Sequence, residues 1–319
     1  MSWRRTMILR AKVMSALLCG VWLWILLLSC GPMIRPPLIN RPGVRRLTSQ
    51  LGIHKHPSWS SDGSSIVFSS AVSEEKSADI FAMSIYGDNL RRLTNNDVDD
   101  RYPTWSPDGT TIAFVSRHSG APPAIYTMNT NGTNVTRLVE GGMPAWSPDG
   151  RKIAFCAGTG DDIEIYVWEQ GHITQLTKNS YLDMSPSWSP DGSRIVFTST
   201  RDVNKDGRID YLDPPHLYVM RSDGSEQQQL TTGLHYDHSP AWSPDGHWIV
   251  YSSYLAEGPD SIYLISADGT QRQLLLDEPD CGDFAWSPDG SQLAFSKGIL
   301  ARDVYIMDVN TVMGANSQQ

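Results

Sequence analysis

The sequence has few cysteines, no recognisable catalytic signature and no convincing helix beyond its N-terminus. Four cysteines in 319 residues, two of them within the first thirty, exclude a disulfide-stapled scaffold. No Gly-x-Ser-x-Gly elbow, His-Glu-x-x-His helix or phosphate-binding loop occurs. After the first thirty residues no stretch shows a helical period of convincing length. We therefore expect a protein that is not an enzyme and not built from helices.

Basic residues are also scarce outside the N-terminus. The formal net charge is −9, and the first thirty residues contain four basic residues and no acid, so the remainder carries −13. An acidic body repels a phosphate backbone, so no nucleic-acid partner is expected. The content of 40% hydrophobic residues is nevertheless that of a globular protein.

Residues 1–30 have the layout of an export signal. A basic stretch precedes an apolar run from Val13 to Leu28, which is short for a membrane span of roughly 20 residues. The run ends in Leu-Leu-Ser-Cys30-Gly, which resembles a bacterial lipobox with Cys30 as the lipidated residue, although Leu28 is bulkier than usual. We expect a lipoprotein signal, with an uncleaved anchor or simple cleavage as alternatives. All three put the body of the protein at the periplasmic or cell-surface face, and the first two attach it to the membrane.

Six internal repeats follow a proline-rich tether over residues 31–43. Each contains Pro-x-Trp-Ser-Pro-Asp-Gly or a close variant, and the tryptophans lie 41 to 54 residues apart. Periods in the forties are typical of four-stranded propeller blades. The six tryptophans are Trp59, Trp105, Trp146, Trp188, Trp242 and Trp286. We expect their indoles to pack between blades and the turn aspartates to bond backbone N–H groups.

Each repeat reads as four antiparallel strands joined by hairpins. The Trp strand, the Pro-Asp-Gly turn, two β-branched and aromatic runs and a final Leu-Thr strand follow one another. The sequence therefore predicts an all-β, six-bladed β-propeller over residues 44–309, followed by a polar tail over residues 310–319. Cys156 and Cys281 fall in blades three and six, which lie opposite each other, so no disulfide is expected between them.

The last repeat lacks its outer strand at the C-terminal end. Residues 44–48, Val-Arg-Arg-Leu-Thr, copy residues 90–94, Leu-Arg-Arg-Leu-Thr, which form the outer strand of blade one. We predict that residues 44–48 supply the outer strand of blade six and close the ring, leaving no unpaired edge.

The Pro-x-Trp-Ser-Pro-Asp-Gly repeats resemble those of the TolB β-propeller family. The resemblance covers roughly residues 44 to 309. TolB itself carries an additional N-terminal α/β domain, for which we expect no counterpart here. The resemblance implies a monomeric propeller that contacts a protein partner of the cell envelope or the extracellular side. The alternatives are a carbohydrate- or peptide-ligand binder and, third, a glycan-active enzyme.

The mouth of the central channel is the first candidate site. In propellers of this type the segments just before each Trp strand lie there, and we align the residue three before the motif proline. The candidates for a ligand site are His54, Asp100, Arg101, Asp183, Asp237 and His238. A solvated rim is the alternative to a site for a cation or an amine-bearing ligand. We expect the three aspartates to point into one acidic funnel.

A calcium loop is the second candidate site. Blade four has a long insertion between its second and third strands, and twelve of its residues fit the EF-hand loop pattern. Gly207 permits the sharp turn at position six, and Asp213 replaces the usual glutamate at position twelve. The expected Ca²⁺ ligands are Asp202, Asn204, Asp206, the carbonyl of Arg208, Asp210 and Asp213.

Overall fold

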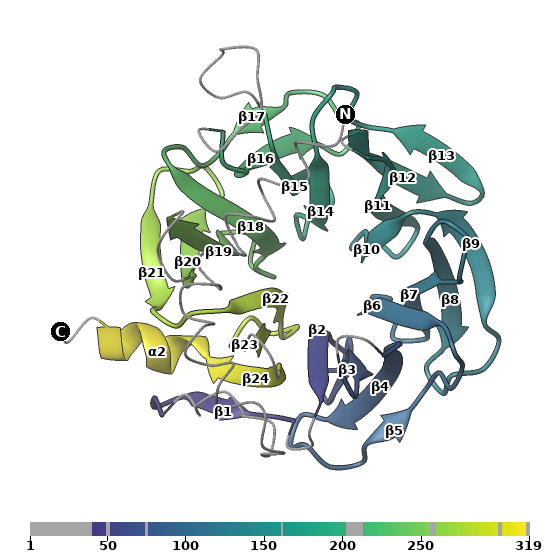
Figure 1. Ribbon diagram of the computed structural model, residues 1–319. Helices are drawn as coiled ribbons and strands as arrows, with labels where there is room; N and C mark the ends of the chain where they lie inside the picture. Colours follow the sequence, from purple (N-terminus) through teal and green to yellow (C-terminus); the bar gives the residue numbers. More distant parts are fainter. Residues whose placement is uncertain are drawn as a thin grey trace, which may run out of the picture. The chain divides into compact units, whose positions relative to one another are not determined.

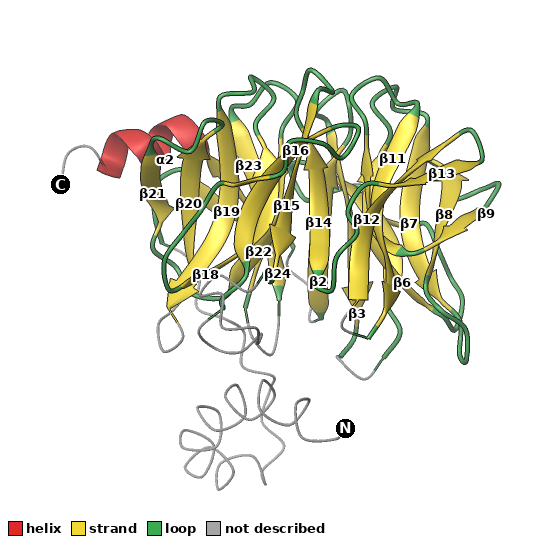
Figure 2. Ribbon diagram, turned by 90° about the horizontal axis from the view of Figure 1, so that it is seen from above, coloured by secondary structure: helices red, strands yellow, loops and turns green. Residues whose placement is uncertain are grey.

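The computed structural model describes residues 40–48, 52–73, 76–160, 162–201, 213–255, 260–298 and 302–316. In these ranges the strands form six four-stranded antiparallel sheets. Figure 1 shows the sheets as blades around a central axis, and Figure 2 shows their strands running between the two faces of the ring. The predicted all-β, six-bladed propeller is confirmed.

The first strand of each blade is the innermost and ends at a motif tryptophan (Figure 1). These strands are β2 (Ile53–Trp59), β6 (Asp99–Trp105), β10 (Gly142–Trp146), β14 (Asp183–Trp188), β18 (His235–Trp242) and β22 (Cys281–Trp286). The second strands are β3 (Ser65–Ala71), β7 (Thr111–Arg117), β11 (Lys152–Thr159), β15 (Arg194–Ser199), β19 (Trp248–Leu255) and β23 (Gln292–Lys297). The turns between first and second strands carry the Asp-Gly pair, whose glycine has a positive φ, such as 71° at Gly63.

The third and fourth strands complete each blade toward the outside. The third strands are β4 (Asp79–Ser84), β8 (Ala124–Asn129), β12 (Asp162–Glu169), β16 (His216–Arg221), β20 (Ser261–Ser266) and β24 (Asp303–Asp308). The outer strands are β5 (Arg91–Arg92), β9 (Thr136–Glu140), β13 (His172–Gln175), β17 (Gln228–Gln229), β21 (Arg272–Leu276) and β1 (Val44–Arg46).

An aromatic pair joins the second and third strands of every blade. Phe68 lies opposite Phe81 in blade one, with ring centroids 6.0 Å apart, and Phe295 lies opposite Tyr305 in blade six at 5.6 Å. Such directly opposed pairs each stabilise a sheet by about 0.2–1 kcal/mol beyond alanine. The apolar run of each repeat therefore sets the register of the hairpin.

The hydrophobic core lies between adjacent blades and is divided into six clusters. Trp59 of blade one packs with Ala294 and Ile306 of blade six, and its indole N–H donates to the carbonyl of Ala285 at 3.0 Å. The other five motif tryptophans also pack against the preceding blade. Of these, Trp188 and Trp286 make the equivalent indole hydrogen bond, to the carbonyls of Ala145 and Ala241. The predicted interblade packing is confirmed.

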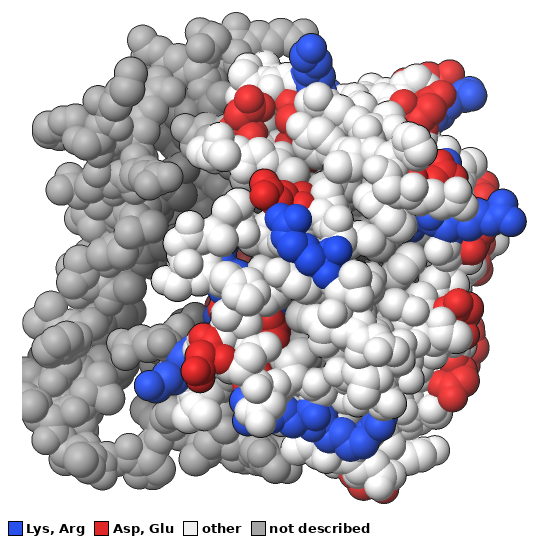
Figure 3. All heavy atoms as spheres, turned by 90° about the vertical axis from the view of Figure 1, so that its right-hand side faces the viewer, with Lys and Arg blue, Asp and Glu red and all other residues white. Residues whose placement is uncertain are grey.

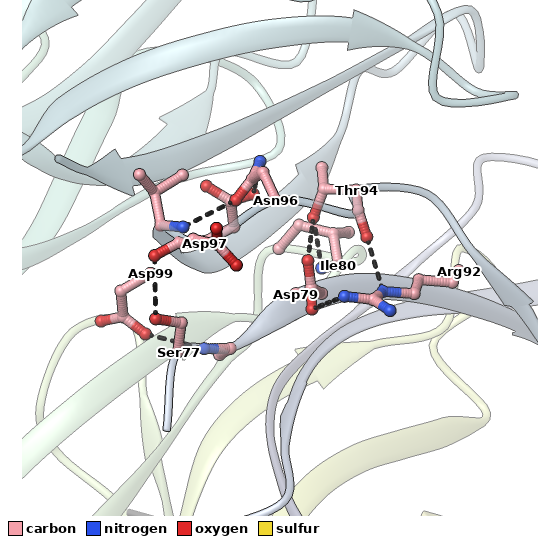
Figure 4. A network of polar contacts seen from close by, with 11 residues as sticks. Ser77, Asp79, Ile80, Arg92, Thr94, Asn96, Asp97 and Asp99 are labelled. Atoms are coloured by element: carbon pink, nitrogen blue, oxygen red, sulfur yellow. Dashed lines mark hydrogen bonds and ion pairs between the residues drawn. The ribbon is translucent and has the colours of Figure 1, made fainter. Parts of the chain in front are cut away.

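The Leu-Thr ending fastens the outer strand to the third strand. In blade one the backbone N–H of Ile80 donates to the hydroxyl of Thr94 at 2.9 Å, and that hydroxyl lies 3.3 Å from a carboxylate oxygen of Asp79. Arg92 pairs with the other oxygen of Asp79 (Figure 4). This network repeats in blade six with residues from opposite ends of the chain.

Strand β1 closes the ring, as predicted. Val44 pairs with Met307, and the backbone N–H of Leu47 donates to the carbonyl of Val304 at 2.8 Å. The hydroxyl of Thr48 donates to Asp303 at 2.7 Å, and Arg46 lies 3.6 Å from the same carboxylate group. These contacts reproduce those of Arg92, Leu93 and Thr94 in blade one.

The residues after 308 differ from the expected polar tail because helix α2 (Val309–Asn316) begins there. Asp308 caps the helix by accepting a hydrogen bond from the backbone N–H of Thr311 at 2.7 Å. Val309 and Val312 are buried against Leu275 and Leu276 at the outer edge of blade five. Spacing of i and i+3 gives this short helix one apolar face, but eight residues are too few for a periodicity search to detect.

The two free cysteines of the described residues, Cys156 and Cys281, are buried in different clusters. The expectation that they do not pair is confirmed. Burial raises the pKa of the Cys156 thiol to about 11.

Within the described ranges, no helix has the length and apolarity needed to cross a membrane. Figure 3 shows basic and acidic side chains interspersed on the outer side of the ring that it faces.

Candidate functional site

A β-bulge in each inner strand builds the wall of the central channel. The pairing of the first and second strands shifts register there in all six blades. The residue at the bulge, directly before the motif proline position, has φ between 52° and 56° although it is never glycine. We call these six residues the channel ring: His56, Tyr102, Met143, Ser185, Ser239 and Asp283.

The channel ring surrounds a cavity of about 360 Å³ together with the motif prolines and the residues after them. A left-handed conformation costs a non-glycine residue roughly 1–2 kcal/mol. Bulges of this kind re-aim a side chain, and here the strained position recurs once per blade. The repeat therefore supplies a constant scaffold, and the six ring side chains give the channel its chemistry.

One side of the ring, contributed by blades six, one and two, is polar and aromatic. The imidazole of His56 lies 3.8 Å (Nε2 to Oδ1) from the carboxylate of Asp283 and stacks on Tyr102 with centroids 3.8 Å apart. Its Nδ1 is 2.9 Å from the hydroxyl of Ser69. The hydroxyl of Ser296 donates to the second oxygen of Asp283 at 2.6 Å. All three ring side chains are half-buried and are held in place by these contacts.

The channel surroundings shift the pKa values of this cluster. Burial lowers the pKa of His56 to about 4, and the attraction of Asp283 only partly offsets it. Burial alone would raise the pKa of Asp283, but His56, the Ser296 hydroxyl and Arg302 outweigh it and the pKa is lowered. Burial raises the pKa of Tyr102 to about 12. Near pH 7 the cluster therefore presents a neutral imidazole, a carboxylate and a phenol.

The other side of the ring, from blades three, four and five, lacks ionisable side chains. The hydroxyl of Ser185 lies 3.5 Å from the sulfur of Met143, and the Ser239 hydroxyl lies 3.2 Å from Nδ1 of His238. Met143 also packs against the core between blades three and four. The channel wall is thus polar and charged on one side and small or apolar on the other.

The predicted channel-mouth aspartates lie inside the blades instead of on an open funnel. Asp100, Asp183 and Asp237 are at most 1% exposed, and none lines the channel cavity. Burial raises the pKa of Asp100, against hydrogen bonds from Ser116, Thr94 and Asn96. Asp183 accepts hydrogen bonds from Asn179 and Ser199, and Asp237 lies 3.3 Å from Nδ1 of His216. Each carboxylate therefore contacts only nearby polar side chains, and Oδ1 of both Asp100 and Asp237 has no hydrogen-bond partner in the described part of the chain.

The remaining channel-mouth candidates are separated as well. His54 is buried with its ring edge-on to Phe68 at 5.7 Å. Arg101 pairs with Asp99 at 2.7 Å, and His238 contacts its neighbour Ser239. The alignment used the residue three before the proline, whereas the bulge turns the residue one before it into the channel. The residue before the proline position differs in chemistry from blade to blade, and this variation was the feature of the sequence that could have identified the channel-facing residues.

The other predicted sites fall largely outside the described residues. Cys30, Asp202, Asn204, Asp206, Arg208 and Asp210 all do. Asp213 is described and is 3% exposed. The insertion does lie between strands β15 and β16, which end and begin at Ser199 and His216. Among the described residues no group of three or more His, Cys, Asp or Glu side chains is placed to hold a metal ion.

Six four-stranded blades around a channel lined by every inner strand define a six-bladed β-propeller. Over residues 44–143 and 140–208 the chain matches the family described as the TolB beta propeller domain, and it belongs to that family.

Relatives by sequence align over short segments. The chain is 38% identical to the Tol-Pal system protein TolB of Desulfosudis oleivorans over 64 residues, which are 20% of this chain and 12% of that protein. It is 33% identical to the Tol-Pal system protein TolB of Alcanivorax borkumensis over 90 residues, 27% of this chain and 20% of that protein. The aligned parts thus span about a fifth or less of these relatives.

Solved structures share the fold over most of the chain. A TolB structure from Agrobacterium tumefaciens superposes with a TM-score of 0.66 and 22% identity, covering 83% of this chain and 96% of the other. An oligogalacturonate lyase in complex with manganese superposes with a TM-score of 0.57 and 16% identity, covering 85% and 94%. At these identities the similarity extends to the fold alone, which binding proteins and enzymes both use.

Proposed function

We propose that this protein is an exported, non-catalytic propeller that binds a protein partner of the cell envelope through its central channel. The channel ring is the observation that supports this most directly. The same bulge recurs in all six blades but carries side chains of different chemistry. The backbone of the channel is therefore repeated, whereas its side-chain surface differs from blade to blade. Two of the sequence relatives are named as Tol-Pal system proteins, and the proposed envelope role is in keeping with that likeness. Two others are named as peptidases.

The burial of the serine hydroxyl beside His56 supports the non-catalytic role. Ser69, His56 and Asp283 are the residue types of a hydrolase triad, with Ser69 and Nδ1 of His56 2.9 Å apart. Ser69 is only 2% exposed, however, and its hydroxyl donates to the carbonyl of Lys55 at 3.1 Å. The hydroxyl is therefore buried and bonded to a backbone carbonyl, and it is not presented to the channel as an exposed nucleophile would be.

Affinity purification from an envelope extract of the source organism tests the proposal. Asn tolerates the left-handed conformation, so Tyr102→Asn and Asp283→Asn change the channel ring with little backbone strain. Both variants should lose a partner that the wild type retains. Ile173→Thr, at a side chain 55% exposed on the outer strand β13, is the matched control and should retain it. Equal recovery by all four proteins would contradict binding through the channel.

A small saccharide or peptide ligand in the channel is the second candidate function. A cavity of about 360 Å³ lies within the range of about 300–1,000 Å³ found for ligand sites. Saturable binding of a purified ligand that Asp283→Asn abolishes would favour this function, and turnover of any member of a glycan panel would favour an enzyme.

Export and lipid attachment form part of the proposal and rest on residues 1–30. Mass spectrometry of the mature N-terminus should find a diacylglyceryl group on Cys30. A mature protein that begins elsewhere, or an unmodified Cys30, would contradict lipid attachment. The proposed Ca²⁺ loop of blade four is a separate structural element, tested in the Discussion.

A further inference from the structure

The outer strands of blades six, one and two are basic, whereas those of blades three, four and five are not. Figure 1 shows β1, β5 and β9 following one another along the outside of the ring. With the residues next to them, residues 41–46, 84–92 and 129–140, they contain six arginines and two acids, a net charge of +4. The corresponding residues 169–175, 221–229 and 266–276 contain two arginines and four acids, a net charge of −2. We call residues 41–46, 84–92 and 129–140 the basic rim.

The three segments of the basic rim meet at the junctions between blades. The hairpin turn of blade one approaches the end of the closing strand so closely that a Cβ added to Gly87 would lie 3.1 Å from the carbonyl oxygen of Leu47. In blade two, a Cβ added to Gly132 would lie 2.5 Å from the carbonyl oxygen of Leu93 in blade one. The basic rim is therefore a continuous surface that crosses three blades.

Two arginines of the basic rim are available to an external anion. Arg45 and Arg91 are exposed and pair with no carboxylate among the residues that the structure describes. The other four each lie near one carboxylate, so that Arg41, Arg46, Arg92 and Arg137 pair with Glu278, Asp303, Asp79 and Glu140, respectively. A guanidinium without an acidic partner is suited to bind a phosphate group.

Exposed apolar side chains lie beside these arginines. Tyr86 is 82% exposed, Val135 52% and Leu90 39%. Tyr86 takes the turn position that is an asparagine in blade two and an aspartate in blades four and five, where the side-chain oxygen accepts from a backbone N–H of the turn. A tyrosine cannot make that bond, so its presence is not explained by the turn. Tyr86 also acts electrostatically on Arg45 across the junction of blades six and one.

We propose that the basic rim rests on the anionic surface of a phospholipid bilayer. The proposal builds on the proposed lipid attachment at Cys30. Val44 begins the first strand of the rim and follows Cys30 by fourteen residues, which span at most about 46–50 Å when fully extended. A lipid on Cys30 therefore holds this rim near the bilayer. Tyrosine rings are enriched at the level of the lipid headgroups, where Tyr86 would lie.

The acidic charge of the rest of the molecule does not prevent this contact. Exposed charges that lie further apart than the Debye length, about 8 Å at physiological ionic strength, are largely screened from each other. Each arginine near an anionic surface raises the affinity by about fivefold. Such a contact is weak, but a tether to the same surface supplies an effective concentration in the millimolar range. A ring that rests on its rim keeps both openings of the channel away from the bilayer.

The test is hydroxyl-radical footprinting of the chain from residue 31, held on vesicles by an N-terminal His tag and a nickel-chelating lipid. This chain contains every described residue and needs no lipid on Cys30, so a failure of lipid attachment does not affect the result. On vesicles that contain phosphatidylglycerol, Tyr86 should be oxidised several-fold more slowly than on phosphatidylcholine vesicles. Ile173, 55% exposed on the outer strand of blade three, should be oxidised equally on both. High salt should remove the protection of Tyr86.

Matched variants show whether the two arginines are responsible. The double variant Arg45→Gln, Arg91→Gln should lose the protection of Tyr86, whereas Arg45→Lys, Arg91→Lys should keep it because the charge is kept. Arg221→Gln removes an arginine that is 60% exposed on blade four and should behave like the wild type. Thermal unfolding establishes that each variant is folded.

Three results would overturn the proposal. The first is equal oxidation of Tyr86 on the two kinds of vesicle, and the second is protection that persists in the double glutamine variant. The third is protection that appears only after an envelope extract is added, which would mean that the basic rim binds a protein.

Discussion

The aspartate of each Pro-Asp-Gly turn holds its turn closed from within. In blade four, Oδ1 of Asp191 accepts from the hydroxyl of Ser189 at 2.6 Å and from the N–H and hydroxyl of Ser193 at 3.0 and 2.8 Å. These hydrogen bonds lower the pKa of Asp191 to about 2. The turn aspartates of the other five blades have pKa values shifted in the same direction.

The turn aspartates should make the free energy of unfolding of the propeller depend on pH in the acidic range. A carboxyl group whose pKa falls from 3.8 in the unfolded chain to about 2 in the folded chain stabilises the fold above pH 3.8. That stabilisation is lost as the pH falls through 2. Asp191→Asn should therefore be less stable than wild type near pH 7, and the difference should shrink toward pH 2. Urea unfolding at a series of pH values measures this.

Glu140→Gln is the control for this experiment, because the Glu140 side chain is 63% exposed on the outer strand β9 and its ion pair with Arg137 is an exposed one, which contributes little to stability. Its stability should follow the wild-type pH profile. A constant difference between Asp191→Asn and wild type across the pH range would mean that the turn gains nothing from the charge of its aspartate.

At the scale of the element, the hairpin of strands β15 and β16 carries the insertion with the EF-hand pattern. Six oxygen ligands from a twelve-residue loop bind Ca²⁺ with Kd of about 10⁻⁴–10⁻³ M in extracellular modules. The shorter Asp213 in place of glutamate is expected to offer one oxygen to the ion, or to pull the loop tighter. We expect the loop to bind Ca²⁺ in this range of concentration.

Calorimetry with Ca²⁺ decides whether the loop binds. The wild type should release or absorb heat in a saturable titration, and Asp206→Ala should not, because it removes the ligand at position five. Lys205→Ala, at a position that supplies no ligand, should titrate like the wild type. Equal heats from wild type and Asp206→Ala would mean that this loop binds no calcium.

At the scale of the whole molecule, the ring depends on a contact between its two ends. Strand β1 pairs with β24, and Leu47 is buried in the cluster between blades six and one. Losing one such buried leucine costs about 2–5 kcal/mol. Because each kcal/mol shifts the melting temperature of a domain this large by about 2–4 °C, deleting residues 31–48 should lower it by roughly 4–20 °C.

Deletion of residues 31–39 alone is the matched control, since it leaves β1 in place. Differential scanning calorimetry should give this shorter deletion the wild-type melting temperature. If the deletion of residues 31–48 also melts like the wild type, β1 does not hold the ring together.

The sequence by itself determined the number of blades, their four strands and the closing strand. Each blade is built from hairpins between neighbouring segments. The residues Arg46-Leu47-Thr48 repeat Arg92-Leu93-Thr94 of blade one, and this repetition identified the N-terminal segment as the outer strand of blade six. Local turn chemistry and a repeated apolar pattern are properties of the chain alone, so they could be read without coordinates.

Only the tertiary structure decided which side chains face the channel, because the inner-strand bulge breaks the two-residue alternation on which a pattern depends. The bulge turned His56, Tyr102 and Asp283 into the channel and left Asp100 inside its blade. The residues that face the channel therefore depend on the backbone geometry of the inner strands, which the repeated sequence pattern does not specify.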